Sequence, residues 1–317
     1  MPGMITTVIA SRTVVAAVAV AVALMTGIVD PSVLGQQPAF RSGVELVTLS
    51  VTVTSGGNQF VSDLTREDFV VLEENAPQKL THFAKGGVPL ALALLMDTSA
   101  SMEQVLETAQ EAAIGFVRQL GPADVATVID FDSRVQTAQD FTSETRALEN
   151  AIRATRAGGS TSLHNALYIA LKQLAKLTPS DDPGDPRRRA IVVLSDGEDT
   201  SSLVSFDEVF DLASRSDTVI YAIGLGSNDS LNSRGSNDGV FLLRRLTQQT
   251  GGRAFFPRVA ADLATVYSDI RNELASQYVL AYESSGVRDG RWRRIAVRVT
   301  RPNVAVRTRQ GYFASRR

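Results

Sequence analysis

Residues 88–101 read VPLALALLMDTSAS, and this stretch decides the fold. The run from Val88 to Met96 is apolar without a break, as expected for a strand that is buried on both faces of a parallel sheet. Residues 102–120 then carry apolar side chains at helical spacing, and Gly121-Pro122 ends the pattern. A buried strand that leads directly into an amphipathic helix is the building unit of α/β folds.

The same alternation of strands and helices continues to residue 275. Strands are expected at residues 125–131, 135–138, 191–194, 219–224 and 254–256. Helices are expected at residues 143–155, 162–177, 205–215, 239–250 and 260–275. Residues 226–239, rich in Ser, Asn and Gly, are predicted to form a loop. Right-handed crossovers place such strands in a mainly parallel sheet between helix layers, so we assign the α/β class with a Rossmann-like, doubly wound sheet.

The segments on either side of this unit, residues 37–87 and 276–317, have the period-two pattern of β-strands. Apolar residues alternate with polar ones from 47 to 53 and again from 294 to 299. Each segment is too small to be stable alone. We therefore expect the two to pair into one smaller β-sandwich-like domain, with the α/β domain of residues 88–275 inserted between them.

The composition excludes several kinds of chemistry. The 317 residues include no cysteine and only two histidines, His82 and His164. Disulfides, thiolate metal sites and cysteine nucleophiles are therefore absent, and a His-rich zinc centre or a Ser-His-Asp hydrolase has almost no material. The formal net charge of −2 does not indicate a nucleic-acid partner.

Positive charge is concentrated in residues 286–317, which hold ten arginines and a single acid, Asp289. Because Arg294 and Arg298 alternate with apolar residues, most of this charge is interpreted as the solvated face of a sheet. A patch for a polyanion or a membrane surface is the alternative interpretation.

The amino terminus has the layout of a secretory signal peptide. An apolar run at residues 13–29 follows Arg12, and small residues follow with Val33 and Gly35 placed for cleavage, so we assign residues 1–36 to the signal. The alternative is a retained membrane anchor, because the run is at the lower limit for spanning a bilayer. Either interpretation places the rest of the chain outside the cytoplasm, secreted or in the periplasm or cell envelope.

Three loops at the expected carboxyl ends of strands carry oxygen ligands. The first presents Asp97, Ser99 and Ser101, the second is residues 158–162 (GGSTS), and the third is residues 195–197 (SDG). Ligands of open α/β sheets bind at this edge. Two carboxylates and three hydroxyls form a hard, all-oxygen donor set that suits Mg²⁺ or Mn²⁺ and leaves room for an anionic ligand.

The segments VPLALALLMDTSASM, AGGSTSLHNAL and IVVLSDGEDTS resemble the three loops of the von Willebrand factor type A domain, whose metal-ion-dependent adhesion site has this form. The resemblance covers about residues 88–275 and implies a mostly parallel sheet with helices on both faces and one antiparallel edge strand. It also implies the ligand set. By position, the metal ligands are Asp97, Ser99, Ser101, Thr161 and Asp196.

The second loop departs from the family pattern. Its usual form is Gly-Gly-Thr, whereas Ser160 intervenes before Thr161 in this chain. Aligning on the following Leu163 and Ala166 favours Thr161, and Ser160 or Ser162 are the alternatives. The flanks FRSGVELVTLSVTVT, LTREDFVVLEENAPQKLTHF and RWRRIAVRVTRPNVAVRTRQGYFA resemble those of secreted bacterial proteins that carry such a domain between β segments.

Other ionisable residues near these loops have simpler interpretations. His164 lies one turn beyond Thr161 and is assigned a structural or rim position rather than a catalytic one. Asp130 and Asp132 flank Phe131 at a strand end, where a solvated pair or a partner of the metal ligands is expected rather than an acid–base pair.

The family resemblance implies a non-enzymatic module that binds a protein ligand, through an acidic side chain, by means of Mg²⁺, with Mn²⁺ or Ca²⁺ as alternatives. Two rivals remain. One is a structural component of the cell envelope whose metal only stabilises the fold. The other is a metal-dependent hydrolase or phosphotransferase with Asp97 as nucleophile, which would need a second carboxylate where Ser99 stands. The identity of the partner and the oligomeric state stay open.

Overall fold

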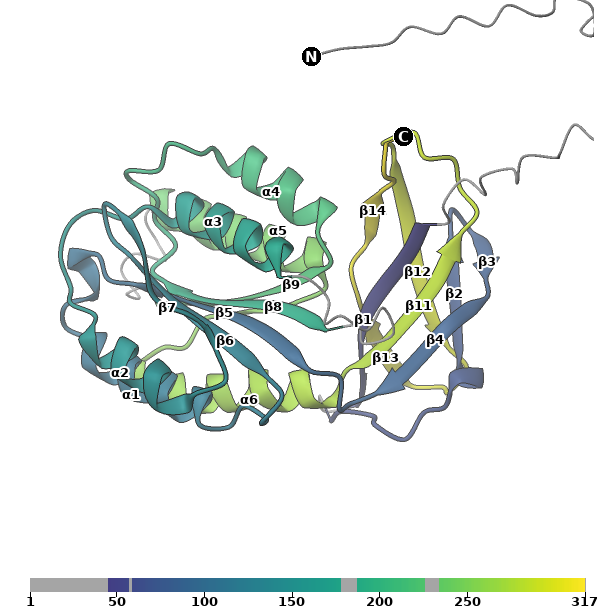
Figure 1. The fold of residues 1–317 in the computed structure, drawn as a ribbon, viewed down its shortest axis with the longest axis horizontal. Helices are drawn as coiled ribbons and strands as arrows, with labels where there is room; N and C mark the ends of the chain where they lie inside the picture. Colours follow the sequence, from purple (N-terminus) through teal and green to yellow (C-terminus); the bar gives the residue numbers. More distant parts are fainter. Residues whose placement is uncertain (1–44, 57–58, 178–186, 226–233, 317) are drawn as a thin grey trace, which may run out of the picture. The chain divides into compact units, whose positions relative to one another are not determined.

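The computed structural model describes residues 45–56, 59–177, 187–225 and 234–316 (Figure 1). The predicted signal peptide at residues 1–36 lies outside these residues. Within the part that is described, no helix combines the length and the apolar character needed to cross a membrane.

A six-stranded sheet forms the centre of the α/β unit (Figure 1). In sheet order its strands are β10 (Ala254–Phe255), β9 (Thr218–Gly224), β8 (Arg188–Ser195), β5 (Leu90–Asp97), β6 (Val125–Phe131) and β7 (Val135–Thr142). The first five run parallel, and β7 pairs with β6 antiparallel at the edge. The α/β fold class, with a sheet of mostly parallel strands, is confirmed.

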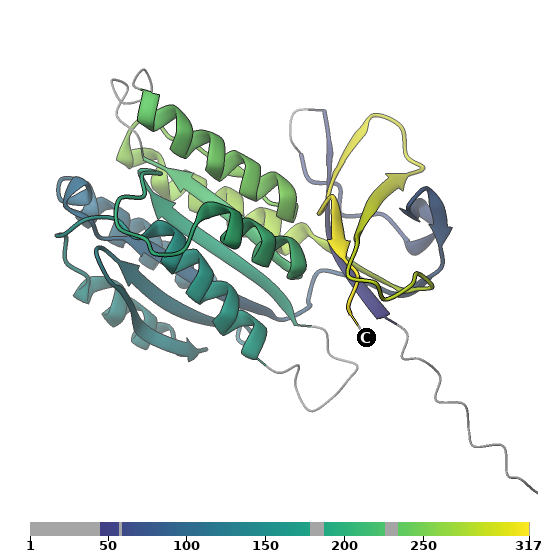
Figure 2. The same ribbon diagram turned by 90° about the horizontal axis from the view of Figure 1, so that it is seen from above.

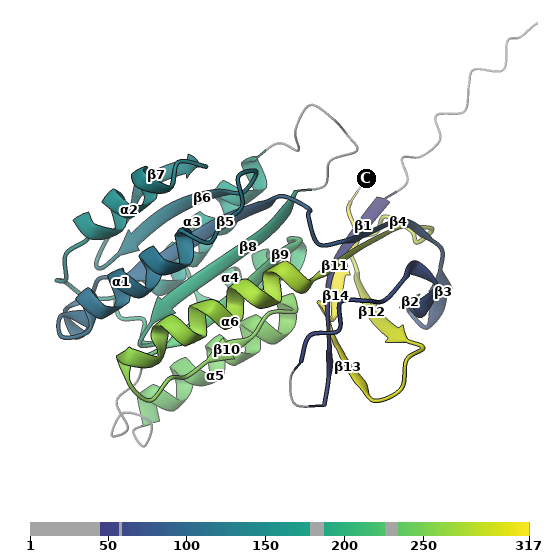
Figure 3. The same cartoon turned by 90° about the horizontal axis from the view of Figure 1, so that it is seen from below.

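Helices cover both faces of this sheet. Seen from above, α3 (Leu163–Lys176), α4 (Phe206–Arg215) and α5 (Arg234–Thr250) lie over one face (Figure 2). Seen from below, α1 (Leu106–Val117), α2 (Thr145–Ala154) and α6 (Leu263–Ser276) lie over the other (Figure 3). The 3₁₀ turns η2 (Ala100–Met102) and η4 (Ala260–Asp262) precede α1 and α6.

The central strand β5 explains why the sheet is buried on both sides. All eight of its residues are buried, and alternate residues enter different core layers. Leu92 and Leu94 pack with the layer of α1, α2 and α6, whereas Ala91 and Ala93 pack with the layer of α3, α4 and α5. The unbroken apolar run in the sequence is therefore the consequence of having no solvent-facing side.

The flanking segments form two antiparallel sheets of four strands each. One has the order β13 (Val304–Arg307), β1 (Glu45–Ser55), β11 (Tyr278–Ser284), β4 (Leu80–Lys85). The other has the order β14 (Gly311–Phe313), β12 (Trp292–Val299), β2 (Phe69–Glu73), β3 (Ala76–Gln78), and the turn η1 (Arg66–Asp68) leads into β2. Each sheet thus combines two strands from each end of the chain, and the two sheets share one apolar core.

In the flanking strands, the alternation of buried and exposed residues agrees with the sequence prediction in most places. Ile295 is buried, while Arg294 and Arg298 are exposed on the opposite side of β12, as the alternation predicts. Strand β3 begins at Ala76, where a turn was expected, and two larger differences follow. The short strand β14 was not foreseen, and α5 begins at Arg234, inside the region assigned to a loop.

A buried carboxylate on α6 connects the two architectures. Glu273 is 2% exposed and accepts hydrogen bonds from Tyr221 Oη of β9 at 2.7 Å and from Thr52 Oγ1 of β1 at 3.3 Å. It also forms an ion pair with Arg307 of β13. One side chain therefore joins α6 to the central sheet and to the β-sandwich.

Candidate functional site

The first loop follows β5 and turns its carboxylate inward. Asp97 and Ser99 are buried, whereas Ser101 is exposed. Asp97 Oδ1 accepts a hydrogen bond from the Ser99 backbone N–H at 2.9 Å, which is a local carboxylate-to-backbone turn. The Oγ atoms of Ser99 and Ser101 lie 3.0 Å apart in a hydrogen bond. The loop thus directs one carboxylate and two hydroxyls into one place.

The third loop meets the first because β5 and β8 are neighbours in the sheet. Met96 and Leu194 are paired in register, so the two strands end at the same level. Ser101 Oγ donates to Asp196 Oδ2 at 2.6 Å across the two loops. Asp97, Ser99, Ser101 and Asp196 therefore form one hydrogen-bonded set, as proximity of the strand ends predicts.

The second loop is attached to both of the others through its backbone. Gly158 N–H donates to Thr98 O at 2.8 Å. Thr161 N–H donates to Thr200 Oγ1 at 3.0 Å, and Thr161 O accepts from the Thr200 N–H at 2.9 Å. Gly159 has φ +72° and a Cβ there would lie 2.7 Å from Ser133 Oγ, so the close approach of this loop requires glycine.

Thr161 is buried in this loop, but no hydrogen bond within the described residues joins its hydroxyl to the other four predicted ligands. The alternatives in the same loop differ from it. Ser160 is exposed, and the Ser162 hydroxyl donates to Asp132 O at 2.7 Å. The assignment of Thr161 as the ligand stays a prediction.

The electrostatics of the set favour a cation. Burial raises the pKa of Asp97 to about 6, and the neighbouring charge of Asp196 acts in the same direction, against the lowering effect of hydrogen bonds from Ser195 and Ser99. Among the described residues, no Lys or Arg forms an ion pair with either carboxylate. Two uncompensated carboxylates beside hydroxyls, with no soft donor, fit a hard divalent cation.

Sequence reasoning missed the role of Ser195. This residue ends β8, and its buried Oγ donates to Asp97 Oδ2 at 2.6 Å while accepting from the Gly197 N–H at 3.1 Å. The signal was present, because a hydroxyl residue stands at the strand end next to Asp196. The pattern alone did not separate this positioning hydroxyl from an ordinary turn residue.

We expect Ser195→Ala to weaken Mg²⁺ binding by about 10- to 100-fold, the usual cost of losing a hydrogen bond that orients a metal ligand. Without the hydroxyl, Asp97 loses the donor that fixes one oxygen and favours its ionised form. Isothermal titration with Mg²⁺ measures the effect. Ser201→Ala, in the neighbouring segment, is the control, and equal affinities in the two variants would contradict the assigned role.

His164 serves the architecture of the rim. Its Nδ1 lies 3.3 Å from Asp199 Oδ2, and its backbone N–H donates to Asp199 Oδ1 at 3.2 Å. The Ser202 hydroxyl donates to Asp199 Oδ1 at 2.7 Å. These contacts fasten the segment after the third loop to the start of α3, which agrees with a structural assignment. Asp130 is half-buried, and burial raises its pKa.

Comparison with known proteins agrees with the fold and the three loops. Residues 92–198 match the von Willebrand factor type A domain family, a range that contains Asp97, Thr161 and Asp196. This stretch of the chain is therefore similar to the von Willebrand factor type A domain family. The match begins within β5 and ends just after the third loop, so it covers all three loops of the site.

Individual relatives are more distant. An uncharacterized protein of Synechocystis sp. is 33% identical over 114 residues, which are 35% of this chain and 26% of that protein. The aligned region thus spans about a quarter of that curated relative. A von Willebrand factor type A structure from Catenulispora acidiphila has a TM-score of 0.50 at 12% identity, over 84% of this chain and 73% of that one. A mutant of the PilB minor pilin from Streptococcus sanguinis has a TM-score of 0.50 at 12% identity, over 61% and 63% of the two chains. At these identities the likeness is one of fold.

Proposed function

We propose that the chain is an exported, non-enzymatic binding module that attaches to an acidic group of a protein partner through a divalent cation. Mg²⁺ is the expected ion, with Mn²⁺ or Ca²⁺ as alternatives. The observation that carries the proposal is the hydrogen-bonded set in which Asp97, Ser99, Ser101 and Asp196 converge from two strand ends.

Asp97, Ser99, Ser101, Thr161 and Asp196 would hold the cation. When bound, the cation supplies a Lewis-acidic position for a partner carboxylate. The burial gradient across the set suits this use: Asp97 and Ser99 are buried, whereas Ser101 is exposed and Asp196 is partly exposed. A ligand therefore has access from the Ser101 side, while the inner residues anchor the ion.

The environment of Asp97 favours binding over turnover. Both of its oxygens accept hydrogen bonds, from the Ser99 N–H and from the Ser195 hydroxyl, and its side chain has no exposed surface. A carboxylate used as nucleophile must reach the substrate in line with the bond that breaks. A buried carboxylate that is fixed by two hydrogen bonds is better suited to holding an ion than to attacking a substrate.

Export rests on the apolar run at residues 13–29, which lies outside the described residues. The absence of cysteine fits a chain held together by packing alone, and the three buried clusters supply that packing. A minor pilin is among the proteins that share the fold, which accords with an exported binding module.

The test is capture of a partner from cell-envelope extract on the immobilised full chain. We expect retention of a partner in Mg²⁺, its release by a chelator, and no retention by the Asp196→Asn variant. Glu198→Gln, an exposed neighbour outside the set, is the matched control and should behave as the wild type. Retention of the partner that is changed neither by the chelator nor by the Asp196→Asn substitution would contradict the proposal.

Two further readouts separate the rivals. A melting temperature that rises with Mg²⁺ while nothing is retained would favour a structural metal. Turnover of generic phosphoesters by the pure protein, lost in Asp97→Asn, would favour the enzyme.

A further inference from the structure

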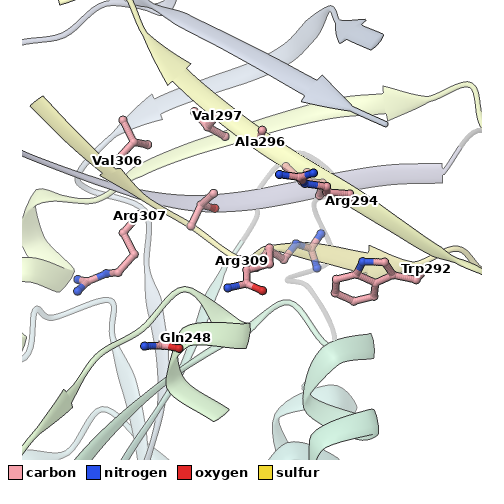
Figure 4. Close-up of a pocket in the computed structure, with 11 residues that line it drawn as sticks. Gln248, Trp292, Arg294, Ala296, Val297, Val306, Arg307 and Arg309 are labelled. Carbon is pink, nitrogen blue, oxygen red and sulfur yellow. The ribbon is translucent and has the colours of Figure 1, made fainter. Parts of the chain in front are cut away.

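The carboxyl-terminal arginines form a second polar site in the β-sandwich. A pocket of about 670 Å³ is lined by β12, β13, the segment 308–310 that leads to β14, and Gln248 of α5 (Figure 4). This volume lies in the range of small-molecule pockets and exceeds the size of a single inorganic anion. The view shows Arg307 at one end of the pocket, Trp292 at the other, and Arg309 between them.

The charged side chains that line the pocket are all positive. Arg294, Arg307 and Arg309 line the pocket, and no Asp or Glu does. Arg307 is paired with Glu273, but neither Arg294 nor Arg309 takes part in an ion pair within the described residues. Burial lowers the pKa of the Arg309 guanidinium, and the nearby charges of Asp217 and Glu45, outside the lining of this pocket, act in the opposite direction.

Three consecutive residues at this pocket have buried polar atoms without a partner. Arg307 Nε, Thr308 Oγ1 and Arg309 Nε make no hydrogen bond within the described part of the chain. Native proteins satisfy about 90% or more of such groups, so a cluster of three needs an explanation. These atoms are themselves enclosed, but two of them belong to guanidinium groups of residues that line the pocket, and such groups favour an anionic acceptor.

The segment that carries these atoms is held in place by α5. A Cβ on Gly251, just after that helix, would lie 2.6 Å from Arg309 N, so the helix end packs directly on the backbone of residues 308–309. Arg309 Nη1 also donates to Ser216 O at 3.2 Å. The donors are therefore positioned by the fold and do not belong to a free surface arginine.

We propose that this pocket binds a small organic molecule that carries a phosphate or sulfate group. Arginine guanidinium groups match such oxyanions in charge and in donor geometry. The remaining volume, bordered by Trp292 and by the apolar side chains of Ile295 and Val306, accommodates the organic part.

The pocket is separate from the proposed cation site. Gln248 stands in the last turn of α5, whereas a Cβ on Gly239 near its start would lie 2.2 Å from Gly197 O of the third loop. At 1.5 Å per residue, the nine residues between them span about 14 Å. The two sites can therefore be tested independently.

The chain has a single tryptophan, and it lines the pocket, so its fluorescence reports on occupancy. We would titrate the full chain with glycerol 3-phosphate, inorganic phosphate, inorganic sulfate and glycerol at constant ionic strength. A chelator is present throughout, which removes any contribution of the cation site and keeps this result separate from the test of the proposed function. Isothermal titration serves as the second readout.

We expect a saturable signal with glycerol 3-phosphate and none with glycerol. Inorganic phosphate or sulfate that binds more weakly than the ester supports an organic ligand. Equally tight binding of the free anion would overturn the organic part of the proposal, and the absence of saturable binding with every anion would overturn it entirely.

Arg294→Gln is expected to weaken binding by about 10-fold or more, the effect of one charge-assisted contact. Arg298→Gln removes an exposed arginine from the same strand but outside the pocket, and it should bind as the wild type. Equal weakening by both variants would mean unspecific attraction to positive charge and would overturn the site.

Discussion

Asp97→Asn is expected to lower the affinity for Mg²⁺ by at least about 100-fold, more than the loss of an orienting group alone produces. The substitution removes the buried negative charge but keeps the shape of the side chain. The amide oxygen can still accept from the Ser99 N–H, and the amide NH₂ can donate to Ser195 Oγ, which now accepts instead of donating. Isothermal titration on the full chain measures the loss, and wild-type affinity in this variant would contradict the proposed site.

The same substitution should stabilise the protein in a chelator. The folded-state pKa of Asp97, about 6, lies above its ordinary value of 3.8, so the folded chain keeps a proton that the unfolded chain has lost. The free energy of unfolding therefore falls as the pH rises from about 4 to about 6, by about 3 kcal/mol in total. At pH 7 without metal, Asp97→Asn avoids this loss and should be more stable by about 1–3 kcal/mol.

Urea unfolding at pH 4 and pH 7, with Mg²⁺ and with a chelator, tests whether Asp97→Asn stabilises the protein in the absence of metal. Mg²⁺ at a concentration that saturates the wild type should stabilise it and should stabilise the variant much less, because the variant binds the ion far more weakly. Asp196→Asn is the comparison, since its side chain is partly exposed and its loss should give little stabilisation without metal. Identical stability of wild type and Asp97→Asn in chelator would refute the electrostatic argument.

Glu273→Ala should destabilise the full chain by about 3–5 kcal/mol, the cost of removing one partner from a buried ion pair. The change leaves the fully buried Tyr221 hydroxyl without its acceptor and Arg307 without its counter-charge. Thr52 loses a partner as well. Glu273→Gln, which keeps an acceptor oxygen, should lose less.

The midpoint of urea or thermal unfolding measures this effect. Asp269→Ala, an exposed acid on the same helix, is the matched control and should change the free energy of unfolding by less than about 0.5 kcal/mol. Equal midpoints for Glu273→Ala and Asp269→Ala would show that the buried network does not hold α6 to the sandwich.

The order of helices and strands could be predicted from the sequence because a buried element has a recognisable local pattern of apolar residues. The run from Val88 to Met96 is apolar at every position since β5 has no solvent-facing side. The start of α5 has no such pattern. Arg234 begins the helix within a Ser-, Asn- and Gly-rich stretch, and Gly239 packs against Gly197 O, so a tertiary contact outweighs local composition.

The candidate sites were predictable to different degrees. The sequence predicts that the metal-ligand candidates lie close together, because neighbouring parallel strands end at one edge of the sheet. These candidates are Asp97, Ser99, Ser101 and Asp196. The sequence could not distinguish the arginines that the fold buries from those that stay exposed. Arg298 and Arg309 look alike in the sequence, and only the packing of α5 on residues 308–309 buries one of them. No local pattern records a contact between segments so far apart.

The insertion of the α/β domain between β4 and β11 has a consequence for the order of folding. Lys85 and Tyr278 are paired across these strands, and Gly86 N–H donates to Gln277 O at 3.3 Å. Closing a flexible loop of roughly 190 residues would cost about 5 kcal/mol in chain entropy. A domain that has already folded brings its own two ends together and removes most of that cost. The α/β domain thus acts as a template for closure, and β1 stays without its partner strands, open to misassociation during biosynthesis, until β11 and β13 have been made.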